Sequence, residues 1–108
     1  MWSATVLSLF PEMFPGTLGL SIAGKALKND IWSLKMINIR DFSNDKNGKV
    51  DDVPFGGGHG MVIKPDVIDK ALNSVIDAEG PRIYLSPRGK KFDQRFAKRL
   101  SEEKGAVF

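Results

Sequence analysis

The sequence predicts an α/β domain built on a parallel sheet with flanking helices. Short apolar runs rich in β-branched residues alternate with segments in which apolar residues recur at helical spacing. Their order is strand, helix, strand, loop and helix, strand, helix, strand, which is typical of a parallel sheet with right-handed crossovers. Ligands bind such sheets beyond the carboxyl ends of the strands, so we expect a site at that edge.

Two strands and a helix are predicted in the N-terminal part of the chain. A run of β-branched and large apolar residues predicts a strand over residues 5–10, which a proline ends. Residues 17–29 carry two neighbouring apolar stripes, which predicts a helix capped by its first threonine. Gly19 and Gly24 lower helix propensity, so we expect close packing at both positions. Partial alternation predicts a second strand over residues 34–39.

A long loop and the clearest helix are predicted next. Residues 40–60 lack sustained periodicity and include a strongly turn-forming run, so we expect a loop that is functional or disordered. A helix is predicted over residues 66–78, where Pro65 suits the first turn. The apolar stripe of this helix consists of Val67, Ile68, Ala71, Leu72, Val75 and Ile76.

Three elements complete the predicted order. Residues 82–85 form an apolar run typical of a third strand, and a turn-forming Ser-Pro-Arg-Gly sequence follows it. Apolar residues at helical spacing predict a helix over residues 92–100, with Gly105 as its C-terminal stop. Residues 106–108 predict the opening of a fourth strand.

The composition narrows the class of protein. The 108 residues fit one domain, and 42% hydrophobic and 27% charged residues are ordinary for a globular protein. The chain has no cysteine, which excludes disulfides and cysteine metal sites and fits the reducing cytoplasm, where we expect the protein. No apolar run approaches membrane-spanning length, so we expect no membrane partner. The net charge of +3 permits a polyanionic partner without demanding one.

Four glycines crowd into five positions shortly after the paired carboxylates Asp51 and Asp52. Glycine loses the most conformational entropy on folding, so such a cluster opposes order unless a function needs it. A binding loop explains why Pro-Phe precedes the glycines and an apolar run follows them, and a flexible tether is the alternative. The glycines of this loop are Gly56, Gly57, Gly58 and Gly60.

Two familiar nucleotide-binding motifs do not fit the glycine loop. A P-loop places a lysine directly after its last glycine, whereas the first lysine after Gly60 is Lys64. The dinucleotide-binding fingerprint would need its third glycine where Met61 or Ile63 stands. The loop is therefore not a standard nucleotide loop.

Three collinear segments together resemble one family. They are Leu9-Phe10-Pro11-Glu12-Met13-Phe14, residues 38–42 with Asp51-Asp52 and the glycine loop, and Tyr84-Leu85-Ser86-Pro87-Arg88-Gly89. Spread over nearly all of the chain, they resemble the N-terminal part of the bacterial tRNA (guanine-N1)-methyltransferase, which methylates the guanosine on the 3′ side of the anticodon. The resemblance implies a SPOUT-class α/β fold, a trefoil knot in the full-length protein only, a homodimer, tRNA as partner and S-adenosylmethionine as methyl donor.

The resemblance also implies two groups of site residues. The cofactor-binding group consists of Tyr84, Leu85, Ser86, Pro87 and Gly89. The substrate-binding group consists of Asp51, Gly56, Gly57, Gly58 and Gly60, where missing side chains leave room for an extruded purine. His59, the only histidine, receives no role. Methylation of guanine N1 needs a general base, which the family supplies beyond residue 108, so no catalytic residue and no metal ligand is predicted here.

Three functions stay open. In the first, residues 1–108 form the N-terminal part of a SPOUT methyltransferase domain that is inactive alone. In the second, the same fold serves as a non-catalytic RNA-binding or dimerisation module. The third is an α/β domain that binds phosphate esters or nucleotides, and the failed motif tests count against it.

Overall fold

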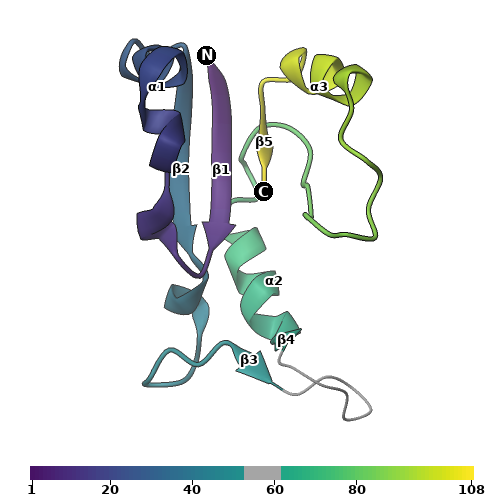
Figure 1. The fold of residues 1–108 in the computed structure, drawn as a ribbon. Coiled ribbons are helices and arrows are strands. Elements are labelled where there is room, and N and C mark those ends of the chain that lie inside the picture. Colours follow the sequence, from purple (N-terminus) through teal and green to yellow (C-terminus); the bar gives the residue numbers. More distant parts are fainter. Residues whose placement is uncertain (53–61) are drawn as a thin grey trace.

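The computed structural model describes residues 1–52 and 62–108 and has an α/β fold (Figure 1). Strands and helices both occur along the chain, but they do not alternate as strictly as predicted. In chain order the elements are β1 (Trp2–Ser8), the 3-10 turns η1 (Pro11–Met13) and η2 (Gly16–Gly19), α1 (Ser21–Lys28), β2 (Trp32–Asn38), the 3-10 turn η3 (Ile39–Phe42), β3 (Asp51–Asp52), β4 (Val62–Ile63), α2 (Pro65–Asn73), α3 (Gln94–Ser101) and β5 (Gly105–Val107). Within the described residues, no helix combines the length and apolar character needed to cross a bilayer.

The main sheet is parallel and has the strand order β2-β1-β5. β1 pairs with β2 along its whole length, from Trp2 opposite Trp32 onward, and with β5 from Ser3 opposite Gly105 onward. Figure 1 shows α1 beside β2 and α3 beside the start of β5, so helical segments flank both edges of the sheet. The predicted parallel α/β sheet is confirmed.

The predicted strand over residues 82–85 reduces to a single bridge. Arg82 pairs in parallel with Val107, and the Ile83 N–H donates to the Val107 carbonyl at 2.7 Å. Tyr84 and Leu85 then leave the sheet and are 89% and 74% exposed. A strand preference takes effect only where side chains pack on neighbours, and no described layer covers these two residues. The strand prediction is therefore wrong beyond Arg82.

A second, antiparallel sheet was not predicted. β3 and β4 pair with Asp51 opposite Ile63 and Asp52 opposite Val62, on either side of the residues that the structure does not describe.

The chain before β3 contains more regular and buried structure than predicted, since η3 follows β2 directly and Val50 is only 2% exposed. Val50 packs with the core although its neighbours in the sequence are polar, so no periodic pattern predicted its burial. The predicted loop is therefore interrupted by η3 and β3, whereas residues 43–50 between them form no helix or strand, as predicted.

Both early helices are shorter than predicted. α1 begins only at Ser21, after η2, because Leu20 is extended and Ser21 has φ of +54°, so the backbone between η2 and α1 is not helical. A Cβ on Gly24 would overlap the carbonyl oxygen of Gly19, which confirms the close packing predicted for the two glycines. α2 ends at Asn73, where the Ser74 hydroxyl donates to the Ala71 carbonyl at 2.6 Å and so competes with the helical pattern.

The core lies where η3, the chain before β3 and the first turns of α2 meet. Ile39, Val50 and Val67 form its buried centre. Val67 and Ala71 of α2 and Val75 just after its end are buried, whereas Ile76 of the predicted stripe is 69% exposed. The buried face of α2 is thus one residue wide at each turn and narrower than the sequence pattern suggested. Partly buried side chains around the centre are Leu7, Leu9, Phe42, Ile63 and Ile68.

Candidate functional site

The five residues predicted to bind the cofactor line one pocket of about 570 Å³. A volume of this size suits a small organic ligand. Residues that the sequence analysis did not assign to a site complete the wall, and two of them are cationic and two aromatic. The full lining is Ile83, Tyr84, Leu85, Ser86, Pro87, Gly89, Lys90, Lys91, Phe92 and Phe96. The predicted group is therefore brought together by the fold, and its use by a cofactor stays a prediction.

Hydrogen bonds within the turn fix one side of the pocket. The Ser86 hydroxyl accepts the Arg88 N–H at 3.1 Å, and the Ser86 carbonyl accepts the Gly89 N–H at 3.1 Å. A Cβ on Gly89 would lie 3.3 Å from the same carbonyl oxygen, which is closer than side chains usually approach. The predicted Ser-Pro-Arg-Gly turn is confirmed, and its compact form depends on the serine and the glycine.

Aromatic side chains give the pocket an apolar wall. The Phe92 and Phe96 rings meet edge to face with centroids 5.5 Å apart, and the Arg99 guanidinium lies 5.4 Å from the Phe96 centroid. Phe92 is 65% exposed, so much of its ring is open to a ligand. The sequence analysis placed Phe92 and Phe96 only in a helix stripe. Their position directly after the turn was the signal that could have assigned them to the pocket.

Arg82 ties the chain that enters the pocket to the end of α2. Its Nη1 donates to the carbonyls of Ala78 at 2.9 Å and Gly80 at 2.8 Å. Its Nη2 donates to the carbonyls of Val75 at 2.9 Å and Ile76 at 3.0 Å. Carbonyls at and after a helix C-terminus lack helical partners and carry partial negative charge. One guanidinium therefore satisfies four of them and anchors the residue two positions before Tyr84.

Replacing Arg82 with alanine is expected to lower the free energy of unfolding by about 2 kcal/mol, because four carbonyls lose a charged donor at a partly exposed site. Arg88→Ala is the matched control, since the Arg88 side chain makes no hydrogen bond within the described structure. The control should change stability by less than about 0.5 kcal/mol. Urea denaturation of both variants measures the difference, and equal losses would contradict the role assigned to Arg82.

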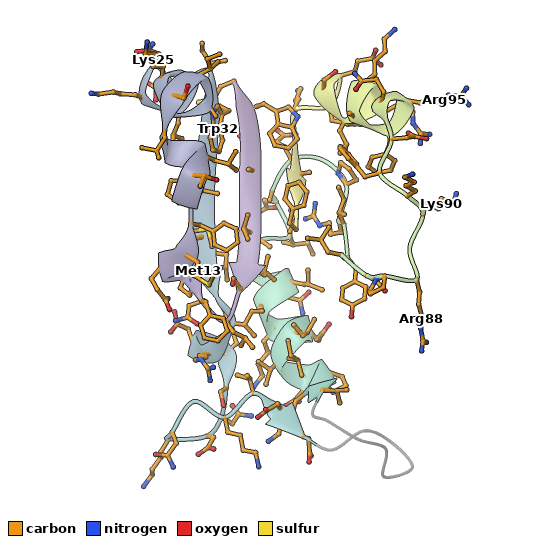
Figure 2. The ribbon with its side chains drawn as sticks, viewed as in Figure 1. Met13, Lys25, Trp32, Arg88, Lys90 and Arg95 are labelled. Carbon is orange, nitrogen blue, oxygen red and sulfur yellow. The ribbon has the colours of Figure 1, made fainter. Side chains whose placement is uncertain are left out.

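The predicted substrate residues lie on another element. Asp51, partly buried, and Asp52, exposed, form β3, which Figure 1 shows beyond the carboxyl ends of β1 and β2. In Figure 2 the labelled Arg88 also lies toward the end of the molecule to which the strands point. The turn and β3 thus share one side of the molecule. The predicted glycines Gly56, Gly57, Gly58 and Gly60 lie outside the described residues, so their role in substrate binding stays a prediction.

Potential metal ligands do not gather in the described part of the chain. No three His, Cys, Asp or Glu side chains there lie close enough together to hold a metal ion. His59 lies outside the described residues. The pocket wall itself contains no carboxylate, so its chemistry comes from backbone groups, aromatic rings and the cations Lys90 and Lys91.

Comparison with known proteins covers almost the whole chain. The family model described as tRNA (Guanine-1)-methyltransferase TrmD matches residues 2–108. The tRNA (guanine-N(1)-)-methyltransferase of Wolbachia pipientis subsp. Culex pipiens is 54% identical over 103 residues, which cover 94% of this chain and 44% of that protein. Proteins of the same name are 52% identical in Rhodospirillum rubrum, with 92% of this chain and 41% of the relative covered, and 52% identical in Bartonella tribocorum, with 96% and 44% covered.

The chain therefore spans less than half the length of these curated relatives. The family match, in contrast, leaves out only the first residue of the chain. It includes all three segments that carried the resemblance in the sequence, together with the turn that lines the pocket. The chain belongs to the tRNA (guanine-N1)-methyltransferase family.

Proposed function

We propose that the chain works as the N-terminal part of an S-adenosylmethionine-dependent methyltransferase that modifies guanine N1 of tRNA, at the guanosine 3′ to the anticodon. Family membership supports the reaction class and the substrate. Within the chain, the observation that carries the proposal is the convergence of Tyr84, Leu85, Ser86, Pro87 and Gly89 on one pocket. A SPOUT-class knot, a homodimer and a cytoplasmic location belong to the same proposal.

The chemistry of the pocket fits S-adenosylmethionine, which supplies an electrophilic methyl group on a sulfonium. The adenine ring can stack on the exposed aromatic surfaces of Tyr84 and Phe92. The ammonium groups of Lys90 and Lys91 can pair with the cofactor's carboxylate. The compact Ser86–Gly89 turn places Gly89 in the wall, where the missing side chain allows a ligand to approach the backbone closely.

The substrate proton has to be removed by another part of the enzyme. Guanine N1 is protonated at neutral pH, so its methylation requires a general base within hydrogen-bond reach. No carboxylate lines the pocket, and neither Asp51 nor Asp52 belongs to its wall. We therefore assign the described residues to cofactor binding and orientation, and the base to chain outside them.

Tyr84→Ala is expected to weaken S-adenosylmethionine binding about tenfold, because loss of one stacking aromatic typically costs this much. Stability should not change, because the side chain is 89% exposed. Calorimetric titration of the cofactor into the protein at its full natural length measures the affinity. Ile76→Ala removes a large apolar side chain, 69% exposed, that does not line the pocket, and serves as the control.

The same titration separates the candidate functions. A Tyr84→Ala variant that binds the cofactor as tightly as the unmodified protein would remove this pocket from the proposal. Tight binding of tRNA without any cofactor binding would instead favour the non-catalytic RNA-binding module.

A further inference from the structure

Positive charge is concentrated in one part of the chain. Residues 82–108 contain eight Lys or Arg and three Asp or Glu, a net charge of +5. Residues 1–81 contain eight Lys or Arg and ten Asp or Glu, a net charge of −2. The modest total of +3 therefore hides a strongly basic segment that includes the pocket wall and α3.

Five exposed cations of this segment form a surface that we call the cation track. Lys90 and Lys91 line the cofactor pocket, whereas Arg95 and Lys98 line an open groove of about 670 Å³ along α3. Figure 2 shows Arg88, Lys90 and Arg95 projecting from the same flank of the molecule, away from the sheet. The track, which consists of Arg88, Lys90, Lys91, Arg95 and Lys98, thus leads from the pocket along the outer side of α3.

The fold holds the track outward and leaves its charge uncompensated. The carboxylate of Asp93 accepts the Phe96 N–H at 2.8 Å and so caps α3. The indole N–H of Trp2 donates to the Leu100 carbonyl at 3.0 Å and ties the helix to the sheet. No cation of the track forms an ion pair with a carboxylate in the described part of the structure. Charge runs of this kind are commonly solvated, but here an unpaired run borders a candidate site directly.

We propose that the cation track binds the phosphodiester backbone of the tRNA whose guanine enters the adjoining pocket. The inference rests on the proposed function and adds the surface that positions the substrate. Arginine and lysine contacts to phosphates fix the register of a nucleic acid without specifying its sequence. Gln94 and Ser101 add hydrogen-bonding groups to the groove, and none of the described residues that line it is aromatic, although aromatic anchors are typical of protein partners.

The test uses the double substitution Arg95→Gln and Lys98→Gln in the protein at its full natural length, with a labelled tRNA anticodon stem–loop as probe. Affinity should fall roughly tenfold near 0.1 M salt, and the slope of log K against log salt should become shallower by about 1 to 2, because two phosphate contacts are lost. Cofactor affinity should be unchanged, since neither residue lines that pocket.

The matched control is the double substitution Lys25→Gln and Lys28→Gln. These residues lie three positions apart in the last turn of α1, and Figure 2 shows Lys25 on the opposite flank. The control removes the same charge, so it should leave RNA affinity and the salt slope near those of the unmodified protein. Equal losses in both double variants would reduce the track to a net-charge effect and overturn the proposal.

The remaining outcomes separate the track from the enzyme. If the unmodified protein methylates the RNA and the track variant keeps the same RNA affinity and KM, the proposal for the cation track is wrong and the proposed function stands. Track-dependent RNA binding without methylation would support the track and contradict the function. Failure of the unmodified protein to bind the RNA would overturn both. Track-dependent binding to anionic phosphatidylserine vesicles in place of RNA would assign the surface to lipid and overturn the RNA proposal.

Discussion

Gly80→Ala is expected to lower the free energy of unfolding by about 4 kcal/mol, because it combines backbone strain with overlap in a packed region. Gly80 has φ of +89°, a conformation that side-chain-bearing residues rarely adopt. A Cβ at this position would overlap the carbonyl oxygen of Gly105 in β5. Gly105 has little room to move toward β1, since a Cβ on Gly105 would itself overlap the carbonyl oxygen of Ser3. The added methyl group must therefore push β5 away from β1 or displace the chain that leads to Arg82.

A glycine in open space separates the two causes. Gly16 has φ of +59° and no atom within 4 Å of the position of an added Cβ. Gly16→Ala thus carries the backbone strain without the overlap and should cost about 1 kcal/mol. Urea denaturation, followed by circular dichroism, compares the two variants. Similar losses would mean that strain alone explains the effect and that the contact between Gly80 and Gly105 adds nothing.

The 108-residue chain alone is expected to transfer no methyl group to tRNA, whereas the protein at the length of its relatives should turn over. The chain spans less than half of those relatives. The pocket proposed for the cofactor is lined by the Tyr84–Gly89 turn and the start of α3, and its described wall has no carboxylate. A chain that offers the proposed cofactor one side of a pocket and the guanine proton no described base there lacks two requirements of the reaction.

Incorporation of a labelled methyl group into tRNA, measured for both lengths side by side, tests this expectation. The long protein is the positive control for the RNA and the cofactor. Turnover by the short chain at a comparable rate would show that its own residues include the base. Asp51 would then be the first candidate, and Asp51→Asn in the short chain would have to abolish the signal.

Local patterns predicted the parts of the fold that local physics determines. β1 and β2 follow from β-branched and apolar runs, and the compact Ser86–Gly89 turn follows from its serine, proline and glycine. The five predicted cofactor residues line one pocket because neighbours in a turn share one surface, and their use by a cofactor stays a prediction. These features need few distant contacts to form.

Features that depend on distant partners could not be predicted in this way. The β3–β4 pair has two residues in each strand, too few to show a period, and the burial of Val50 depends on side chains from η3 and α2. Arg82 donates to four carbonyls that are available because α2 ends at Asn73, whereas the helical pattern predicted a later end. Tyr84 and Leu85 have the composition of a strand but no layer to pack on. In each case tertiary context decided the outcome.

Pairing of β1 with β5 gives the domain an unusual order of assembly. β1 and β2 can meet early, because the crossover through α1 that joins them is much shorter than the chain between β1 and β5 and costs less entropy to close. Ser3, however, pairs with Gly105, so this half of the sheet must wait until almost all of the intervening chain has been synthesised. Contacts between such remote residues slow folding. The central strand of the sheet therefore keeps one edge open until β5 has been synthesised, and β1 pairs with β5 after it can pair with β2.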